Sequence, residues 1–224
     1  MTVQNQNKVY VDIIKSTCQF VKQQLGNAEG GHDWFHIERV WRNAQLISKS
    51  EKGNQLVIEL AALLHDIADY KFNGGDERIG PRMTENFLES IHVERSIIKE
   101  VVFIVENISY KGGHTENIKK TIELEIVQDA DRLDAIGAIG IARTFNFGGF
   151  KGSTMYDPQQ KPNINQSKEE YKKSNGTTIN HFHEKLLLLK NLMNTETGME
   201  LAESRHNYMI NFLQQFHNEW NGLN

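Results

Sequence analysis

The fold is decided by residues 56–66, LVIELAALLHD, a run that is apolar on almost every face of a helix. A helix without a polar face is normally buried inside a protein. The run closes on a histidine and an aspartate, His65 and Asp66. Burying a carboxylate there costs several kcal/mol unless another charge compensates it. A divalent cation would supply that charge, and imidazole together with carboxylate suits a first-row transition metal.

Two other segments carry residues of the same kind. Residues 32–36, HDWFH, stand before a helical apolar pattern, and residues 129–134, DADRLD, stand within one. Metal ligands in proteins are often gathered from segments that are distant in sequence. The three clusters therefore predict one ion held between helices.

The remaining apolar spacing predicts an all-α protein, with no alternation typical of strands and no internal repeat. Helices are expected over residues 10–25, 33–47, 56–70, 81–88, 97–108, 122–145, 178–193 and 199–220. Pro81 fits the first position of its helix. Gly137 and Gly140 are expected to allow close packing. Residues 146–175 are rich in glycine and polar side chains and predict a mobile loop, too long for a simple connector.

We expect a single domain over residues 1–224, because no convincing boundary interrupts the pattern. Its core would span about 8–145, followed by the flexible loop at 146–175. The helices over 178–220 look too amphipathic to fold alone, so they are expected to pack on the core.

Composition excludes several functional classes. Apolar residues make up 38% of the chain, and no stretch approaches the ~20 apolar residues that span a bilayer. The net charge is −4 with no basic stripe, so neither a nucleic acid nor a membrane is an expected partner. Residues 1–8 show no secretion signal, and the single Cys18 fits a reducing cytoplasm. A small phosphorylated substrate stays compatible with this charge, and the sequence leaves monomer and homodimer undecided.

The first cluster has structural as well as chemical interpretations. His36 lies at the edge of an apolar stripe and by itself reads as a half-buried histidine bonded to a carbonyl. Asp33 stands where a helix N-cap is expected, so capping explains it at least as well as chemistry. His32 lies one turn before His36 and is interpreted as a phosphate contact or a solvated histidine rather than a ligand.

The second cluster gains weight from its buried context. His65 and Asp66 diverge by about 100° on a helix, so they converge only on an atom over the helix edge. Asp69 lies one turn after His65 and could orient a water molecule or simply end the helix. Lys71 would contact phosphate, with a solvated lysine as the alternative.

The third cluster is ambiguous on helix periodicity alone. Asp129 and Asp134 flank the apolar face of their helix more closely than Asp131 does. A helical wheel therefore selects Asp129 or Asp134 as the inward ligand.

The order of His36, residues 63–66 (LLHD) and residues 130–133 (ADRL) resembles the HD-domain superfamily of metal-dependent phosphohydrolases. In that pattern a histidine on one helix, a His-Asp pair on another and a distant aspartate bind one divalent ion. The resemblance implies an HD-type helical bundle with the metal ligands His36, His65, Asp66 and Asp131. It thus selects Asp131 against the helical wheel.

Three longer phrases are similar to a bacterial branch of that superfamily, the YpgQ-like and YedJ-like proteins. They are residues 32–36, residues 128–138 (QDADRLDAIGA) and residues 181–187 (HFHEKLL), and the similarity extends over nearly the whole chain. Members of the branch are taken to hydrolyse nucleoside triphosphates to the monophosphate and pyrophosphate. The resemblance implies that reaction here.

Two imidazoles and two carboxylates would leave positions open on an ion, which could then polarise a phosphoryl oxygen and activate water for in-line attack. Developing charge on the phosphate makes nearby cations important. The candidates for that contact are Lys71, Lys111, Arg132, Lys185 and Arg205. Asp69 or His32 would orient the water or protonate the leaving group, and residues 146–175 would form a lid.

Manganese or magnesium is the first expectation for the ion, with nickel, iron, cobalt and zinc as alternatives. Competing functions are a nucleoside 5'-monophosphatase, a phosphodiesterase, or a metal-dependent nucleotide sensor without turnover. Product analysis separates these functions.

Overall fold

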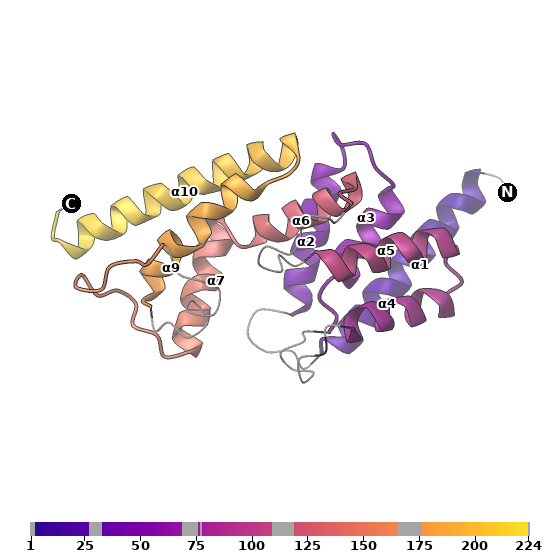
Figure 1. Ribbon diagram of the computed structural model, residues 1–224, viewed down its shortest axis with the longest axis horizontal. Coiled ribbons are helices and arrows are strands. Elements are labelled where there is room, and N and C mark those ends of the chain that lie inside the picture. The colour runs from indigo at the N-terminus through magenta and orange to yellow at the C-terminus, as the bar shows by residue number, and fades with distance from the viewer. Residues whose placement is uncertain are drawn as a thin grey trace. The chain divides into compact units, whose positions relative to one another are not determined.

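The computed structural model describes residues 3–26, 33–68, 76, 78–108, 119–164 and 176–223. All regular structure in these ranges is helical (Figure 1), which confirms the predicted all-α class. The helices are α1 (Val3–Gln24), α2 (Trp34–Ile47), α3 (Gln55–Leu64), α4 (Ile79–Ser90), α5 (Arg95–Asn107), α6 (Ile122–Asp134), α7 (Gly137–Phe150), α9 (Thr178–Glu184), the 3₁₀ helix η1 (Leu186–Leu192) and α10 (Glu196–Trp220). None of the described helices combines the length and apolar character that a membrane-spanning segment requires.

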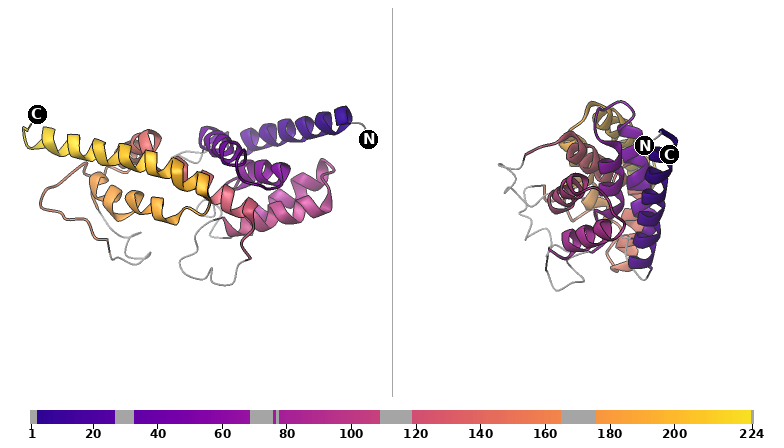
Figure 2. Two further views of the ribbon diagram at one scale, coloured as in Figure 1. Left: turned by 90° about the horizontal axis from the view of Figure 1, so that it is seen from above. Right: turned by 90° about the vertical axis from the view of Figure 1, so that its right-hand side faces the viewer.

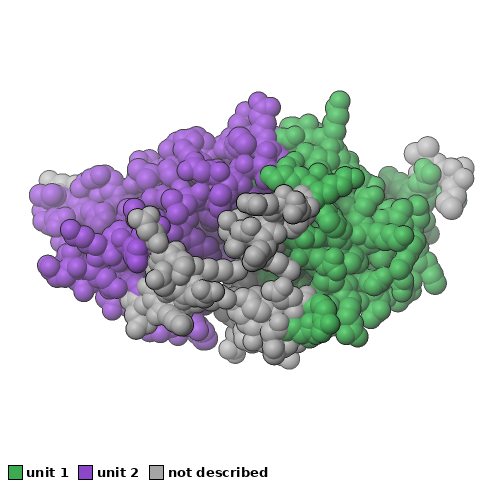
Figure 3. Space-filling view, viewed as in Figure 1, with its two compact units in different colours: residues 1–131 green, residues 132–224 purple. Residues whose placement is uncertain are grey.

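The chain forms two compact units, residues 1–131 and residues 132–224, which Figure 3 shows in different colours. The boundary falls within α6, so its last turn is counted with unit 2. Each unit is described by itself below. The expectation of one domain over 1–224 stays a prediction.

The centre of unit 1 is α3, as its apolar sequence predicted. Residues 57–64 are all buried, and α3 packs against α1, α2 and α5. The helix starts where the Asn54 side chain accepts hydrogen bonds from the backbone N–H groups of Leu56 and Val57. It ends at Leu64, earlier than predicted, and His65 is its C-cap residue. His65 and Asp66 therefore lie at the C-terminal end of α3.

One buried carboxylate joins three helices of unit 1. The Glu59 side chain on α3 accepts hydrogen bonds from Tyr10 Oη at 2.5 Å, Trp41 Nε1 at 2.7 Å, Gln45 Nε2 at 2.9 Å and Gln55 Nε2 at 2.7 Å. Charge-assisted hydrogen bonds of this kind offset the cost of burying the carboxylate. Glu59 thereby fixes α1 and α2 against α3. Burial, together with the hydrogen bond to Glu59, raises the pKa of the Tyr10 hydroxyl.

Unit 2 is built around α10, which packs against α7 and η1, while α9 packs against η1 and α7. Figure 2 shows α1 of unit 1 and α10 of unit 2 as long, unbroken helices. The core of unit 2 contains the aromatic rings of Phe145, Phe182 and Phe212, whose centroids lie 5.8–6.0 Å apart. Phe182 is completely buried.

Two long helices predicted from apolar spacing are each divided. The stretch 122–145 breaks between α6 and α7, where Gly137 adopts a φ of +74°, and α7 continues to Phe150. The stretch 178–193 breaks at Lys185, whose φ of −140° is not helical, into α9 and η1. Helical periodicity does not report such breaks, because the apolar spacing continues on both sides of each break.

The two glycines expected to allow close packing do so. A Cβ atom on Gly140 would lie 2.3 Å from the carbonyl oxygen of Ala135, and one on Gly137 would lie 3.0 Å from Cβ of Arg205. Pro81 is the third residue of α4 rather than its first. A proline is tolerated there because the first turn of a helix has no internal partner for its N–H groups.

The predicted loop at 146–175 is only partly irregular. Its first residues, 146–150, belong to α7, and residues 165–175 lie outside the described part of the chain. Between them, the carbonyls of Thr154 and Met155 accept hydrogen bonds from the N–H groups of Thr178 and Ile179 at 2.9 and 3.0 Å. These bonds connect the loop to the start of α9, where the orphan N–H groups of the helix need partners.

Candidate metal centre

His36 is placed by the first turn of α2. The side chain of Asp33 accepts a hydrogen bond from the His36 backbone N–H at 2.9 Å, which makes Asp33 the N-cap of the helix. The capping interpretation of Asp33 is thus confirmed. Apart from Asn43, the other buried residues of this helix are apolar, and His36 is 3% exposed among them. Packing around the ring therefore restricts the orientation of its imidazole.

His65 is placed by the C-terminal end of α3. Its Nδ1 atom lies 2.9 Å from the carbonyl oxygen of Ala62. A carbonyl can only accept a hydrogen bond, so this contact requires the proton of the neutral ring to reside on Nδ1. The lone pair is then on Nε2. Metal-binding histidines commonly have their second nitrogen engaged in this way.

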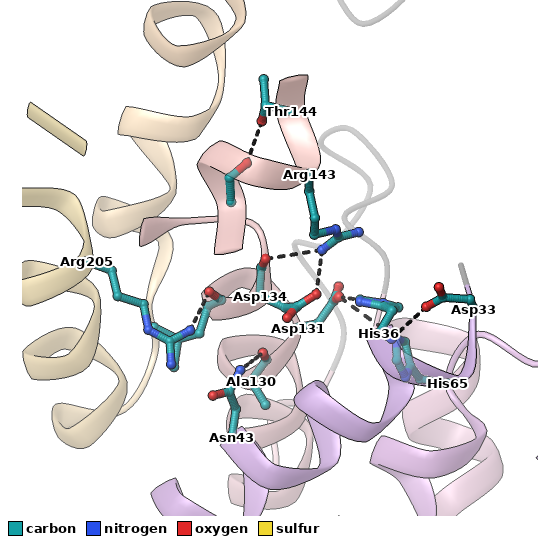
Figure 4. Close-up of polar contacts among 12 residues, drawn as sticks. Asp33, His36, Asn43, His65, Ala130, Asp131, Asp134, Arg143, Thr144 and Arg205 are labelled. Carbon is teal, nitrogen blue, oxygen red and sulfur yellow. Dashed lines mark hydrogen bonds and ion pairs between the residues drawn. The ribbon is translucent and has the colours of Figure 1, made fainter. Parts of the chain in front are cut away.

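Asp131, near the end of α6, completes a group of three side chains. Its Oδ1 atom lies 3.6 Å from Nε2 of His36 and 3.8 Å from Nε2 of His65 (Figure 4). One ligand atom from each of the three residues lies within 4.8 Å of the others. The two imidazole rings have centroids 5.5 Å apart and meet nearly edge to face.

This geometry fits a divalent ion. Nitrogen and oxygen ligands bind such ions at about 2.0–2.2 Å, so two ligands of one ion lie roughly 3–4 Å apart. The separations from Asp131 to the two histidines fall in that range and exceed the length of a hydrogen bond. Two neutral nitrogens and one carboxylate oxygen are also a donor set that transition metals accept. Within the described part of the chain, His36, His65 and Asp131 are thus the group that could hold a metal.

Burial separates the three aspartates of the third cluster. Asp129 and Asp134 are 0% and 1% exposed, whereas the Asp131 side chain is 42% exposed. The helical wheel identified the buried pair correctly, yet Asp131 is the residue beside the two imidazoles. Asp134 instead pairs with Nη1 of Arg143 at 2.5 Å. A ligand that must meet a substrate lies at the edge of the apolar face, which periodicity does not single out.

Asp66 follows His65 in the turn that ends α3 and is partly buried. It is not one of the three residues whose ligand atoms gather within 4.8 Å. Its role as a fourth ligand stays a prediction.

Two cationic candidates of unit 2, Arg132 and Arg205, bond to backbone carbonyls of the same unit. Nη1 of Arg132 donates to the carbonyl of Leu192, and Nη1 of Arg205 donates to the carbonyl of Leu133, both at 2.5 Å. Burial lowers the pKa of the Arg205 guanidinium. Lys185 is exposed in the turn between α9 and η1. Their contact with phosphate stays a prediction, and His32, Asp69, Lys71 and Lys111 lie outside the described residues.

Sequence reasoning missed one polar residue near the candidate centre. Asn43 on α2 is 9% exposed, and its Nδ2 atom donates to the carbonyl of Ala130 at 3.1 Å. A signal was present, because Asn43 interrupts the apolar face of α2 two turns after His36. From the sequence alone, an asparagine inside an apolar stripe indicates no role, because its hydrogen-bond partner is not known.

Comparison with known proteins gives consistent matches. The family model described as HD domain matches residues 34–136, a range that includes His36, His65 and Asp131. The uncharacterized protein YpgQ of Bacillus subtilis (strain 168) is 37% identical over 205 residues, which cover 91% of this chain and 92% of YpgQ.

Solved structures resemble the chain over nearly its whole length. An HD-superfamily hydrolase from Bacillus thuringiensis is 45% identical, with a TM-score of 0.77 over 95% of this chain and 98% of that one. Bacillus subtilis YpgQ in complex with ADP is 33% identical, with a TM-score of 0.75 over 94% of this chain and 96% of that one.

Proposed function

Because the chain belongs to the HD-domain superfamily, in the branch that includes YpgQ, we propose that this hydrolase cleaves nucleoside or deoxynucleoside triphosphates to the monophosphate and pyrophosphate. The observation that carries the proposal is the convergence of Nε2 of His36, Nε2 of His65 and Oδ1 of Asp131. The complex of YpgQ with ADP supports a nucleotide as the ligand class.

A divalent ion at this group would supply Lewis acidity toward a phosphoryl oxygen and toward water. His36 and His65 would hold it with neutral nitrogens, and burial of both rings keeps them in one orientation. Asp131 would contribute negative charge from a side chain that solvent reaches. We propose Asp66 as a fourth ligand and manganese or magnesium as the working ion.

The remaining catalytic and substrate-binding roles in this proposal are assigned from the sequence. Asp69 or His32 would orient the attacking water or protonate the leaving group. The phosphate contacts would come from cations, because charge spreads over the non-bridging oxygens during transfer. The residues proposed for these contacts are Lys71, Lys111, Arg132, Lys185 and Arg205.

The test is product identification. The purified protein, loaded with Mn²⁺ or Mg²⁺, is incubated with a panel of nucleotides and the products are identified by phosphorus NMR. Pyrophosphate together with a monophosphate is the expected result. Orthophosphate from nucleoside monophosphates would show a phosphomonoesterase, and cleavage of diesters alone would show a phosphodiesterase. Metal-dependent binding without any product would show a sensor.

The variant Asp66→Ala tests whether the reaction depends on the bound metal. We expect Asp66→Ala to abolish metal binding and activity together, because it removes a charged ligand next to His65. Metal content of the purified variant, measured by emission spectrometry, checks this. Full metal content in Asp66→Ala would remove Asp66 from the ligand set and leave the other three residues.

A further inference from the structure

Asn43 shares a helix face with His36. The two residues are seven apart on α2, which at about 100° per residue brings them within about 20° of the same direction. The neighbouring side chains on this face, Val40, Ala44 and Ile47, are completely buried. Asn43 is thus an amide within an apolar stripe, two turns from a proposed ligand.

The Asn43 amide makes a hydrogen bond to another helix. Its Nδ2 atom donates to the carbonyl of Ala130 on α6 at 3.1 Å (Figure 4), across a sequence separation of 87 residues. A carbonyl within a helix already accepts a hydrogen bond from the N–H four residues later. The Asn43 bond is therefore additional to the helical bond, on the second lone pair of the oxygen.

An apolar side chain at position 43 would fill the same space without the cost of burying an amide. The hydrogen bond has a property that apolar packing lacks, since it forms at only one register of α6 on α2. Buried polar groups are known to select one register in packed helices. Ala130 is the residue directly before Asp131.

We propose that Asn43 is a positioning residue of the metal centre, which fixes the register of α6 against α2 so that Asp131 faces His36 and His65. A shift of α6 by one residue would move the carboxylate by about 1.5 Å along the helix axis and turn it by about 100°. The 3.6 Å separation between Asp131 and His36 would then be lost. This inference rests on the proposed metal site.

The experiment compares metal affinity with stability. Mn²⁺ binding to wild-type protein, Asn43→Leu and Asn43→Ala is measured by titration calorimetry, and urea denaturation of each is measured in EDTA. Asn43→Leu fills the space of the amide, and Asn43→Ala avoids overpacking. We expect the Kd for Mn²⁺ to rise by about tenfold in both variants, as for loss of other groups that orient ligands.

Thr17→Val is the matched control. Thr17 is completely buried in unit 1, and its hydroxyl donates to the carbonyl of Ile13, a hydrogen bond that stays within α1. This variant should lose stability like the Asn43 variants but keep the wild-type Kd. An unchanged Kd in both Asn43 variants, or an equal rise in Thr17→Val, would overturn the positioning role. If wild-type protein binds no Mn²⁺, the proposed metal site itself fails.

Discussion

Asp131 differs from Asp129 and Asp134 in what its carboxylate faces. The two buried aspartates lie within the protein, and Asp134 is neutralised by Arg143. Asp131 is the most exposed of the three and lies beside two imidazoles. A cation bound there would be a partner for the charge of this carboxylate.

We therefore expect Asp131→Asn to reduce kcat/KM more than Asp129→Asn or Asp134→Asn. The amide keeps the shape of the carboxylate but removes the charge that an ion needs. The loss should exceed the roughly 10–100-fold that follows from changing a group outside the ligand set. Steady-state kinetics of the three variants, with circular dichroism to verify folding, measures the order. Equal losses would leave the assignment of Asp131 without support.

His181 makes unit 2 sensitive to acid. Burial, with a contribution from Lys185, lowers the pKa of its imidazole from 6.5 to about 4. The folded protein thus holds His181 neutral, while the unfolded chain takes up a proton below pH 6.5. Its contribution to stability is complete above pH 6.5 and is lost as the pH falls toward 4.

Between pH 7 and pH 5 this linkage should cost about 2 kcal/mol of unfolding free energy. In His181→Gln the loss over the same interval should be smaller by that amount. Burial also lowers the pKa of His183 and His206, so a residual slope is expected. Urea denaturation at the two pH values checks the prediction, and an equal slope in wild-type and variant protein would refute it.

At the scale of elements, the junction between α6 and α7 depends on glycine. Gly137 has a φ of +74°, and a side chain there would meet Cβ and Cγ of Arg205 at 3.0 Å. Gly152 has a similar φ of +65°, but a Cβ atom there meets nothing within 4 Å. The two positions therefore share a left-handed backbone conformation, which glycine adopts without strain, and differ in packing.

Gly152→Ala should lower the unfolding free energy by about 1 kcal/mol, the cost of a left-handed conformation for alanine. Gly137→Ala should cost more, by roughly a further 1–3 kcal/mol, because it also crowds Arg205. Thermal denaturation of both variants gives the difference. If the two losses agree, the contact with Arg205 relaxes freely and α10 does not constrain the junction.

The carboxylate of Glu59 joins α1, α2 and α3 through four neutral donors. Glu59→Gln should lower the unfolding free energy by about 2–3 kcal/mol, because the amide brings its own N–H groups toward donors and loses the charge. Glu38→Gln is the control, since Glu38 pairs with the largely exposed Arg42 and such a pair contributes at most about 1 kcal/mol. Urea denaturation at pH 7 compares them, and similar losses would mean that the buried network is replaceable.

At the scale of the whole molecule, a metal ion that binds the native protein must also stabilise it. Free ion at a hundred times its Kd adds about 2.7 kcal/mol to the unfolding free energy. We expect Mn²⁺ to raise the Tm above that in EDTA, and Asp131→Asn to remove the difference. Scanning calorimetry measures both. The same Tm for wild-type protein in Mn²⁺ and in EDTA would show that no ion binds the native state.

The helical class and the buried α3 were predictable, because apolar spacing records which face of an element is covered. Helix ends were less so: α3 ends before the predicted residue, and the stretches 122–145 and 178–193 are each divided. Gly137 marks the first break only through its φ, which composition does not give. The second break, at Lys185, could not be predicted, because no turn-forming residue lies there.

The sequence by itself determined which residue types the candidate centre uses. Histidines and aspartates at the ends of apolar helices predict a bound cation, because few other groups there could compensate the buried charge. It did not decide which aspartate of the third cluster is the metal ligand. It also did not indicate that the carbonyls of Ala62 and Ala130 accept hydrogen bonds that place other residues of the centre. Those carbonyls orient His65 and receive the amide of Asn43. Only tertiary structure decided these points, because periodicity describes one helix at a time, whereas a ligand set depends on the register between helices.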